Sequence, residues 1–356
     1  MTPVAIITGC NGLVGSEAVR HFVEQGFDVV GLDNDMRAFF FGPDASTRGV
    51  GDTLLEEYSL TELITISIDI RDREAVESVF ALYGPKVELV VHAAAQPAHD
   101  WAAKDPHTDF EVNAVGTLNL LDATRKHCID APFVHCSTSK VYGANPNDLP
   151  LEELPTRLDL PEDHRYHRGI DTTMSIDQTT HSLFGASKAA GDLLVQEYGN
   201  YFGMPTVCFR PGCLTGPKHA GAQLHGFLSY LMKCAMTGQK YTVFGYGGKQ
   251  VRCNLHAADL VRAFDEFRRA PSAGAVYNIG GGRDSNCSMI EAIAICEELT
   301  GRELDRTYEE ENRIGDHRWW ISSNAAFQAD YPGWKVEHNT KTILQEIFEV
   351  NRDRWS

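Results

Sequence analysis

The sequence feature that most constrains the fold is a short apolar run followed by three regularly spaced glycines. Residues 4–8 are mostly apolar and branched, which predicts a buried parallel strand. Gly9, Gly12 and Gly15 come next, and residues 16–22 predict a helix. Because glycine has no Cβ, it allows a tight turn and lets a phosphate approach the backbone, and the first N–H groups of a helix can bind a pyrophosphate. This order of strand, glycines and helix predicts a dinucleotide-binding fold.

The end of the second predicted strand indicates which dinucleotide binds. Residues 28–32 form that strand, and Asp33 follows it. A carboxylate at this place suits the ribose hydroxyls of NAD and would repel the 2′-phosphate of NADP. We therefore expect NAD as the cofactor. The alternative is an ordinary strand–helix turn that binds no ligand.

Composition excludes several other classes of protein. Of the 356 residues, 43% are hydrophobic and 23% are charged, as in an ordinary soluble enzyme. The net charge of −17 argues against a nucleic-acid partner, and no apolar run reaches the roughly 18 residues of a membrane span. The chain starts directly with a predicted strand, so we expect no signal peptide. Nine scattered cysteines without metal-ligand spacing favour reduced thiols, and we expect a cytoplasmic protein without a metal site.

Strands and helices alternate over about the first 210 residues. Further strands are predicted at residues 64–68, 87–95, 133–137 and 206–210, and helices at residues 112–126 and 182–202. The alternation predicts an α/β fold with a Rossmann-type doubly wound parallel sheet, whose ligands bind beyond the carboxyl ends of the strands. The expected NAD-binding domain is 1–211, with a strand and helix returning at about 254–284. A smaller C-terminal lobe for the substrate is expected at 212–253 and 285–356.

Two segments depart from this alternation. The excursion at 34–63 is longer than an ordinary strand–helix loop, so it either folds over the cofactor or a partner or is a surface insertion. Residues 241–248 resemble a hairpin. After the third strand, a carboxylate in the run from Asp69 to Asp72 is placed to meet an adenine amine, although a helix N-cap is the competing role for Asp72.

Five motifs occur in an order that resembles the extended short-chain dehydrogenase/reductase family. They are Thr8-Gly9-x-x-Gly12-x-x-Gly15, His92-Ala93-Ala94-Ala95, Asn113, Ser137-Thr138-x-x-Val141-Tyr142-Gly143 and Gly248-Lys249-Gln250-Val251-Arg252. The resemblance covers nearly the whole chain, and within the family it is greatest to the CDP-tyvelose (CDP-paratose) 2-epimerases. It implies a bound NAD in contact with Gly9, Asn11, Gly12, Leu13, Val14, Asp33, Asn34, Arg37, Asp69, Ile70, Ala93, Ala94, Ala95, Asn113 and Lys188.

The resemblance also implies a catalytic set of Thr138, the residue at position 184 and Lys188. In the family a tyrosinate, held ionised by the lysine four residues on, takes the proton of a sugar hydroxyl while NAD accepts the hydride. The keto-sugar then turns over and is reduced on its other face. Here Lys188 would lower the pKa of that phenol and Thr138 would bind the reacting oxygen. The family tyrosine, however, falls on Phe184, which cannot transfer a proton.

Three interpretations of Phe184 remain open. The chain is an engineered Tyr→Phe variant, or it has lost catalysis and only binds NAD or a nucleotide sugar, or it is a natural enzyme with a different base. We favour the last. The candidate bases are Cys136, Thr138, Tyr166, Asp171 and His181. For His181 a packing or helix-capping role fits equally well.

Further residues bear on the reaction and the partner. Family 4,6-dehydratases have Asp-Glu after the threonine, whereas this chain has Ser139-Lys140, which argues against dehydration. The resemblance therefore favours epimerisation at C2 of a CDP-hexose, with another carbon or a UDP- or GDP-sugar as the alternative. The implied substrate-binding residues are Gln96, Ser139, Lys140, His181, Arg252, Arg313, Asp316 and Arg318. A homodimer formed by the helices around Asn113 and Lys188 is also implied, and the apolar residues 193–195 fit such an interface or the core.

Overall fold

The computed structural model describes residues 2–219, 226–311 and 315–355 and divides them into two compact units. The first unit comprises the chain up to Val141, Ser182–Arg210 and Val261–Tyr277. The second comprises Tyr142–His181, Pro211–Leu260 and the chain from Asn278 onward.

The segment at 142–181 lies in the second unit, whereas the sequence placed it in the NAD-binding domain. Backbone hydrogen bonds account for this difference. The amide of Ile170 donates to the carbonyl of Ile321 at 2.7 Å, and the amide of Leu158 donates to that of Lys249 at 2.8 Å. These bonds join the segment to residues that come much later in the chain.

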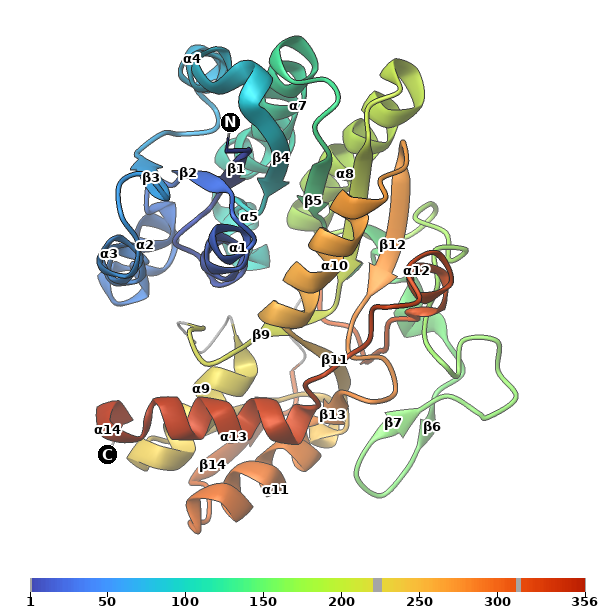
Figure 1. The fold of residues 1–356 in the computed structure, drawn as a ribbon. Coiled ribbons are helices and arrows are strands. Elements are labelled where there is room, and N and C mark those ends of the chain that lie inside the picture. The colour runs from blue at the N-terminus through green and yellow to red at the C-terminus, as the bar shows by residue number, and fades with distance from the viewer. Residues whose placement is uncertain (1, 220–225, 312–314, 356) are drawn as a thin grey trace. The chain divides into compact units, whose positions relative to one another are not determined.

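The first unit contains a seven-stranded sheet with the order β12-β8-β5-β4-β1-β2-β3 (Figure 1). Every pairing from β3 across to β8 is parallel. The strands are β1 (Val4–Thr8), β2 (Asp28–Leu32), β3 (Leu63–Ile66), β4 (Val87–His92), β5 (Phe133–Cys136), β8 (Thr206–Pro211) and β12 (Ala275–Ile279). The strand order reverses between β1 and β4, which is where such sheets bind dinucleotides. The predicted Rossmann-type α/β fold is confirmed.

Helices follow the strands of this sheet in the expected alternation. They are α1 (Leu13–Glu24), α2 (Met36–Phe41), α3 (Arg48–Glu57), α4 (Arg73–Tyr83), α5 (His99–Lys104), α6 (Pro106–Phe110), α7 (Gly116–His127), α8 (Leu183–Phe202) and α10 (Ala257–Arg269). The predicted helix at 112–126 begins with a π-helical turn, η3 (Glu111–Val115), which leads into α7. Asp72 is the N-cap of α4 and accepts a hydrogen bond from the amide of Ala75 at 3.0 Å.

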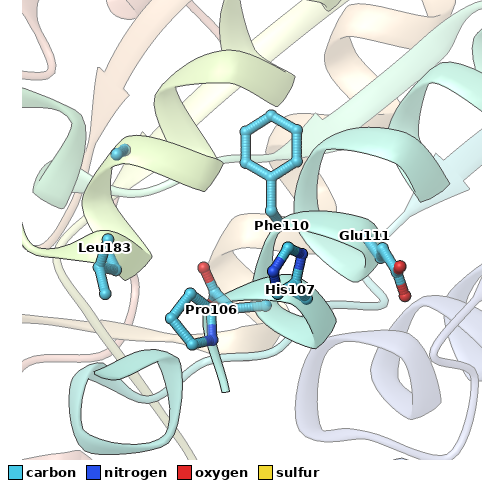
Figure 2. Close-up of a pocket in the computed structure, with 7 residues that line it drawn as sticks. Pro106, His107, Phe110, Glu111 and Leu183 are labelled. Atoms are coloured by element: carbon cyan, nitrogen blue, oxygen red, sulfur yellow. The ribbon is translucent and has the colours of Figure 1, made fainter. Parts of the chain in front are cut away.

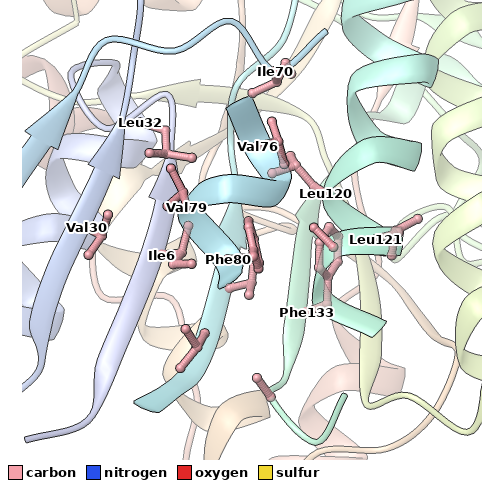
Figure 3. Packing of buried hydrophobic residues seen from close by; sticks show 14 of the residues in the cluster. Ile6, Val30, Leu32, Ile70, Val76, Val79, Phe80, Leu120, Leu121 and Phe133 are labelled. Carbon is pink, nitrogen blue, oxygen red and sulfur yellow. The ribbon is translucent and has the colours of Figure 1, made fainter. Parts of the chain in front are cut away.

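The core of the first unit forms because these strands are apolar on both faces and the covering helices are apolar on one. Figure 3 shows Ile6 and Val30 of the sheet packed with Val79 and Phe80 of α4 and with Leu120 of α7. Phe80 and Leu120 are fully buried. A buried side chain of this kind contributes about 1.5–3 kcal/mol of transfer free energy, so this packing stabilises the sheet that carries the glycine turn.

The excursion at 34–63 folds into α2, a short 3₁₀ turn and α3. Asp35 organises it: its carboxylate accepts hydrogen bonds from the Ser46 hydroxyl at 2.7 Å and the Thr47 amide at 2.9 Å. The rings of Phe39 and Phe40 lie against Trp101 of α5, with centroid distances of 5.2 Å and 4.7 Å. The excursion therefore packs on the segment that follows β4.

The second unit is built from small sheets and from helices that share an apolar core. Its strands are β6 (Glu152–Glu153), β7 (Leu158–Asp159), β9 (Cys213–Thr215), β10 (Tyr241–Phe244), β11 (Val251–His256), β13 (Asn286–Ser288), β14 (Arg306–Glu309) and β15 (Trp319–Trp320). Its helices are α9 (Phe227–Thr237), α11 (Met289–Thr300), α12 (Ala325–Asp330), α13 (Thr340–Val350) and α14 (Arg352–Trp355). Leu231, Ile293 and Ile343 are fully or almost fully buried where α9, α11 and α13 meet.

The predicted hairpin at 241–248 is wrong. Strand β10 pairs in parallel with β14, while the chain turns through Tyr246–Gly248 into β11, which joins a different sheet with β13 and β15. The alternating pattern does form a strand and the glycines do form a turn, but the partner of that strand lies about 65 residues further along the chain. Within the residues that the structure describes, no helix is both long and apolar enough to cross a bilayer.

Candidate active site

Glycine is needed at the three positions after β1 for different structural reasons. Gly9 has φ +66°, and a Cβ there would lie 2.9 Å from the amide nitrogen of Ala94. A Cβ on Gly15 would lie 2.0 Å from the carbonyl oxygen of Gly9. Gly9 and Gly15 are therefore required by the close approach of backbone segments.

No such close approach of backbone segments requires a glycine at position 12. Its φ is −74°, and a Cβ there would meet only the carbonyl oxygen of Gly9, at 3.2 Å. It is the N-cap of α1 and has no side chain to cap the first amides, those of Leu13 and Val14. A helix N-terminus without a side chain over it lets an anionic group approach these amides, so the turn fits the pyrophosphate of NAD.

The end of β2 places a carboxylate beside this turn. Asp33 accepts hydrogen bonds from the amide of Asn11 at 3.1 Å and from that of Asp35 at 2.8 Å. Burial raises the pKa of Asp33, and the two amide donors act in the opposite direction. Asn34 accepts a hydrogen bond from the Met36 amide, and the guanidinium of Arg37 lies 5.0 Å from the ring centroid of Phe41.

The carboxylate after β3 already has a cationic partner. Asp69 accepts hydrogen bonds from Nε and Nη2 of Arg71 at 3.0 Å and 2.7 Å. Burial opposes ionisation, but these bonds lower the pKa of Asp69 overall. The neighbouring Ile70 is buried, and a Cβ on Gly116 of α7 would lie 2.6 Å from its side chain.

A hydrogen-bonded chain holds the segment after β4 against β1. The Thr8 hydroxyl lies 2.8 Å from His92 Nδ1 and accepts a hydrogen bond from the amide of Ala94 at 3.1 Å. His92 Nε2 lies 2.9 Å from the Thr117 hydroxyl of α7. The residues from Ala93 to Ala95 therefore lie beside the glycine turn, at the place where the strand order reverses. Burial, and then the charge of Lys188, lower the pKa of His92 to about 3.

Asn113 joins three segments of the first unit. Its Nδ2 donates to the Gln96 carbonyl at 3.0 Å, to Asp109 Oδ1 at 3.0 Å and to the Ser187 hydroxyl at 3.1 Å. Its Oδ1 accepts from the Gln96 amide at 3.0 Å. The sequence did not single out Asp109, which is buried in this network and whose pKa is raised by burial.

Gln96 is also occupied within the protein. Its side-chain amide donates to the Ala98 carbonyl and to Asp109, its side-chain oxygen accepts from the Ala98 amide, and the residue is fully buried. Contact with a substrate would have to break these bonds, so the structure gives Gln96 a role in holding the loop.

Helix α8 carries the predicted catalytic positions. Its N-cap, Ser182, accepts a hydrogen bond from the Gly185 amide at 3.0 Å. Lys188 is 3% exposed, and its Nζ donates to the Cys136 carbonyl at 2.8 Å, at the end of β5. Burial lowers the pKa of this ammonium group. Phe184 lies one turn earlier and is 6% exposed.

The loop after β5 holds the remaining residues of this region. Thr138 is partly buried, and its hydroxyl accepts a hydrogen bond from the Lys140 amide at 3.2 Å. Ser139 is buried and begins a 3₁₀ turn. Burial raises the pKa of the Cys136 thiol although Lys188 lowers it, so Cys136 has the properties of a protonated thiol more than of a base. The other candidate bases, Tyr166, Asp171 and His181, belong to the second unit.

Sequence reasoning missed His99, the first residue of α5. The centroids of the His99 and Phe184 rings are 5.0 Å apart with the rings at 72°, an edge-to-face contact. His99 Nδ1 lies 2.6 Å from the Ser182 hydroxyl. The available signal was a histidine shortly after the His92-Ala93-Ala94-Ala95 motif, but nothing local connects it with α8.

The predicted diphosphate-binding residues lie in the second unit. Arg252 of β11 forms an ion pair with Asp316 at 3.3 Å and donates to the carbonyl of His317. The Arg318 guanidinium lies 5.8 Å from the ring centroid of Tyr246, and its Nε is buried without a hydrogen-bond partner in the described residues. Arg252, Asp316 and Arg318 are thus brought to one place around the start of β11 and the start of β15. Arg313 lies outside the described residues.

This region provides two arginines in a protein of strongly negative net charge, and the part of the chain that the structure describes offers no hydrogen-bond partner to Arg318 Nε. A guanidinium fork matches phosphate oxygens, and a buried N–H without a partner is costly. An anionic ligand would satisfy that donor. His181 is partly exposed in the same unit. Among the described residues, no cluster of histidine, cysteine and carboxylate side chains could hold a metal ion.

Residues 5–280 match the model of the NAD dependent epimerase/dehydratase family. The chain belongs to this family. NAD is accordingly its cofactor, and the open turn at Gly12 and the carboxylate of Asp33 fit that group.

The individual relatives share between 23% and 30% sequence identity with the chain. The CDP-paratose 2-epimerase of Salmonella typhi is 30% identical over 303 residues, which is 82% of this chain and 83% of the relative. The dTDP-glucose 4,6-dehydratase 1 of Escherichia coli K12 is 26% identical over 98% of this chain and 93% of its own length. The structure of the UDP-glucose 4-epimerase of Thermus thermophilus in complex with NAD has a TM-score of 0.77 at 23% identity, covering 98% of this chain and 99% of that one. It supports the fold.

Proposed function

We propose that this member of the family is an NAD-dependent epimerase of a nucleoside-diphosphate sugar, acting at C2 of a CDP-hexose. The observation that carries the proposal is the pair Ser139 and Lys140 after Thr138, because neither side chain is the carboxylic acid that a sugar 4,6-dehydratase needs there. The relative that is a CDP-paratose 2-epimerase, at 30% identity, supports the choice of nucleotide and carbon. NAD supplies a reversible hydride acceptor when it is bound, so the sugar is oxidised and then reduced again without net change in oxidation state.

In this proposal the first unit binds the cofactor. The amides of Leu13 and Val14 bind the pyrophosphate over Gly12, and Asp33 accepts hydrogen bonds from the adenosine ribose. Lys188 holds the nicotinamide ribose, and Thr138 donates a hydrogen bond to the reacting sugar oxygen. The remaining proposed cofactor contacts are Gly9, Asn11, Asn34, Arg37, Asp69, Ile70, Ala93, Ala94, Ala95 and Asn113.

The second unit binds the nucleotide in this proposal. Arg252 and Arg318 bind the diphosphate, with Arg313 as a further ligand, and Asp316 binds the nucleoside ribose. An incoming diphosphate would replace Asp316 as the partner of Arg252, which frees the carboxylate for the ribose hydroxyls. Ser139, Lys140 and His181 are the further proposed contacts to the substrate.

A second candidate function is a protein that binds NAD and a nucleotide sugar without catalysis. Phe184 favours it, because a phenyl ring at the family tyrosine cannot accept the proton of a sugar hydroxyl. Epimerisation at another carbon, or of a UDP- or GDP-sugar, uses the same residues and differs only in the contacts to the base and the sugar.

The test is proton NMR of the protein with NAD and CDP-paratose or CDP-glucose in deuterated water. A C2 epimer that keeps its hydrogen supports hydride transfer, whereas a deuterated epimer shows exchange through a carbanion and contradicts it. If the chain converts no CDP-, UDP- or GDP-sugar, the epimerase proposal is refuted. In that case binding of CDP-paratose by calorimetry supports the non-catalytic alternative, and turnover by Phe184→Tyr shows that the chain is a disabled variant.

We also propose that the chain is a homodimer through α7 and α8. Apolar side chains are exposed along these helices, with Leu118 at 38%, Leu183 at 50% and Leu193 at 46%, and Phe110 at the end of α6 is 49% exposed. A pocket of about 360 Å³ lies at this place. Figure 2 shows Pro106, Phe110 and Leu183 among the residues that line it. Exposed apolar side chains gathered on adjoining helices mark an interaction surface.

A further inference from the structure

The residue beside Phe184 that can transfer a proton is His99. Its ring contacts the Phe184 ring edge to face at a centroid distance of 5.0 Å. The imidazole therefore lies next to the position where the family has its phenol. Imidazole has an ordinary pKa near 6.5 and exchanges protons readily at neutral pH, which a phenyl ring cannot do.

The structure holds the His99 ring from the α8 side. Nδ1 lies 2.6 Å from the hydroxyl of Ser182, which also accepts the Gly185 amide as the N-cap of α8. A serine oxygen can accept two hydrogen bonds. In the tautomer in which Nδ1–H donates to Ser182, the lone pair of the ring lies on Nε2, and the same bond remains when Nε2 is protonated. Ser182 thus fits both protonation states of the ring.

The structure also holds His99 from its own helix. Two residues further along α5, Trp101 packs against Phe39 and Phe40 of the excursion at centroid distances of 5.2 Å and 4.7 Å. Helix α5 has only six residues, and its position depends on such contacts. These ring contacts connect the excursion with the helix that carries His99.

We propose that His99 is the acid–base residue that replaces the family tyrosine, an inference that rests on the proposed epimerase function. In the first step the sugar O–H bond breaks and its proton passes to His99 Nε2, while the C–H electron pair would leave as hydride, for which a bound NAD⁺ would be the acceptor. The carbinol is thereby oxidised to a ketone. In the return step the hydride adds to the other face of the ketone, the Nε2–H bond breaks, and the proton forms the new hydroxyl.

The experiment combines His99→Gln with a base-swapped variant and a matched histidine control. His99→Gln removes the proton acceptor and keeps an amide for Ser182. The double variant His99→Phe with Phe184→Tyr moves the acid–base group to the family position. His127→Gln, at the far end of α7, is the control for a histidine substitution. Turnover of CDP-paratose with NAD is followed by NMR, and its binding by calorimetry.

His99→Gln should lower kcat by about 10²–10⁴-fold, the usual contribution of general acid–base catalysis, with unchanged affinity for CDP-paratose. The double variant should regain turnover that His99→Gln lacks, and His127→Gln should match the wild type. Wild-type kcat in His99→Gln overturns the proposal and leaves the epimerase function standing. A double variant that folds, binds CDP-paratose and stays inactive also overturns it, because a phenol beside Lys188 should then be competent.

A measurement that does not depend on turnover tests the role of His99 separately from the proposed epimerase function. The ring resonances of His99 are followed by NMR in the NAD-loaded wild type, first with CDP and then with CDP-paratose. A shift that appears only with the sugar supports contact between His99 and the sugar even if no epimerisation is found. If the sugar moves no His99 resonance, the proposal is overturned whether or not the protein is an epimerase.

Discussion

Lowering the pH from 7 to 5 perturbs one buried residue of the first unit by an amount that can be calculated. His92 is hydrogen-bonded between Thr8 and Thr117, and burial is the main reason that its pKa falls to about 3. In the unfolded chain its pKa is about 6.5. Between these two values the unfolded state binds a proton that the folded state does not bind. Folding stability from this residue is therefore complete above pH 6.5 and is lost as the pH falls toward 3.

The size of the effect at pH 5 follows from the two pKa values. One pKa unit corresponds to about 1.4 kcal/mol, and pH 5 lies 1.5 units below the unfolded value, so His92 reduces the free energy of unfolding by about 2 kcal/mol. His135, whose pKa burial also lowers well below its ordinary value, acts in the same direction. Asp33 and Asp109 have raised pKa values and act in the opposite direction. The total pH dependence therefore mixes several groups.

The variant His92→Gln isolates the contribution of His92. Glutamine keeps an amide that can bond to both threonines, but it does not titrate. Urea unfolding at pH 7 and pH 5 gives the loss of stability in each protein, and the variant should lose about 2 kcal/mol less than the wild type. Equal losses in the two proteins would refute the reasoning, because they would mean that His92 is already protonated in the folded state or that it is never buried as a neutral ring.

Three further predictions concern binding and assembly. Gly12→Ala should keep the thermal midpoint near that of the wild type but weaken NAD binding at least about tenfold, or 1.4 kcal/mol. Gly15→Ala should instead unfold the first unit, because the added Cβ would lie 2.0 Å from the carbonyl oxygen of Gly9. Equal thermal midpoints for the two variants would contradict the assignment of their roles. Arg252→Gln should weaken CDP binding by about ten- to a hundredfold in calorimetry, the value of a charge-assisted hydrogen bond, and leave NAD binding unchanged. Unchanged CDP affinity would remove Arg252 from the diphosphate site. Leu193→Glu should shift the protein to monomer in light scattering, whereas Leu82→Glu on α4 should not, and a dimer that survives both changes would exclude this face.

The elements that were predicted correctly have local causes. The strand from Val4 to Thr8 and the turn at Gly9 each follow from the residues of one short segment. The cap formed by Asp72, which the sequence offered as the alternative to an adenine contact, is equally local. Apolar periodicity, the absence of a Cβ and a side-chain cap act within a few residues, so they can be read without knowing the fold. The seven-stranded sheet follows from the same information, because alternating strands and helices have few right-handed arrangements.

The errors and omissions have causes that lie outside the local sequence. The segment around Tyr241 has the pattern of a strand, but its partner at Arg306 could not be inferred, since pairing is decided by the packing of α9, α11 and α13 beneath it. The hydrogen bonds of the Gln96 side chain to Ala98 and Asp109 could not be inferred either. Side-chain partners far apart in the chain depend on the register of several elements at once.

The sequence by itself determined the dinucleotide fold, NAD as the cofactor, the position of Lys188 and the loss of the tyrosine at Phe184, because each is carried by residues within a single motif. Only the tertiary structure decided what surrounds that phenylalanine. His99 and Phe184 lie on helices far apart in the chain, α5 and α8. The aromatic rings of the excursion contact α5, and the Asn113 network contacts α8. Chemistry at a site depends on distances between side chains, and those distances are set by the packing of the whole unit.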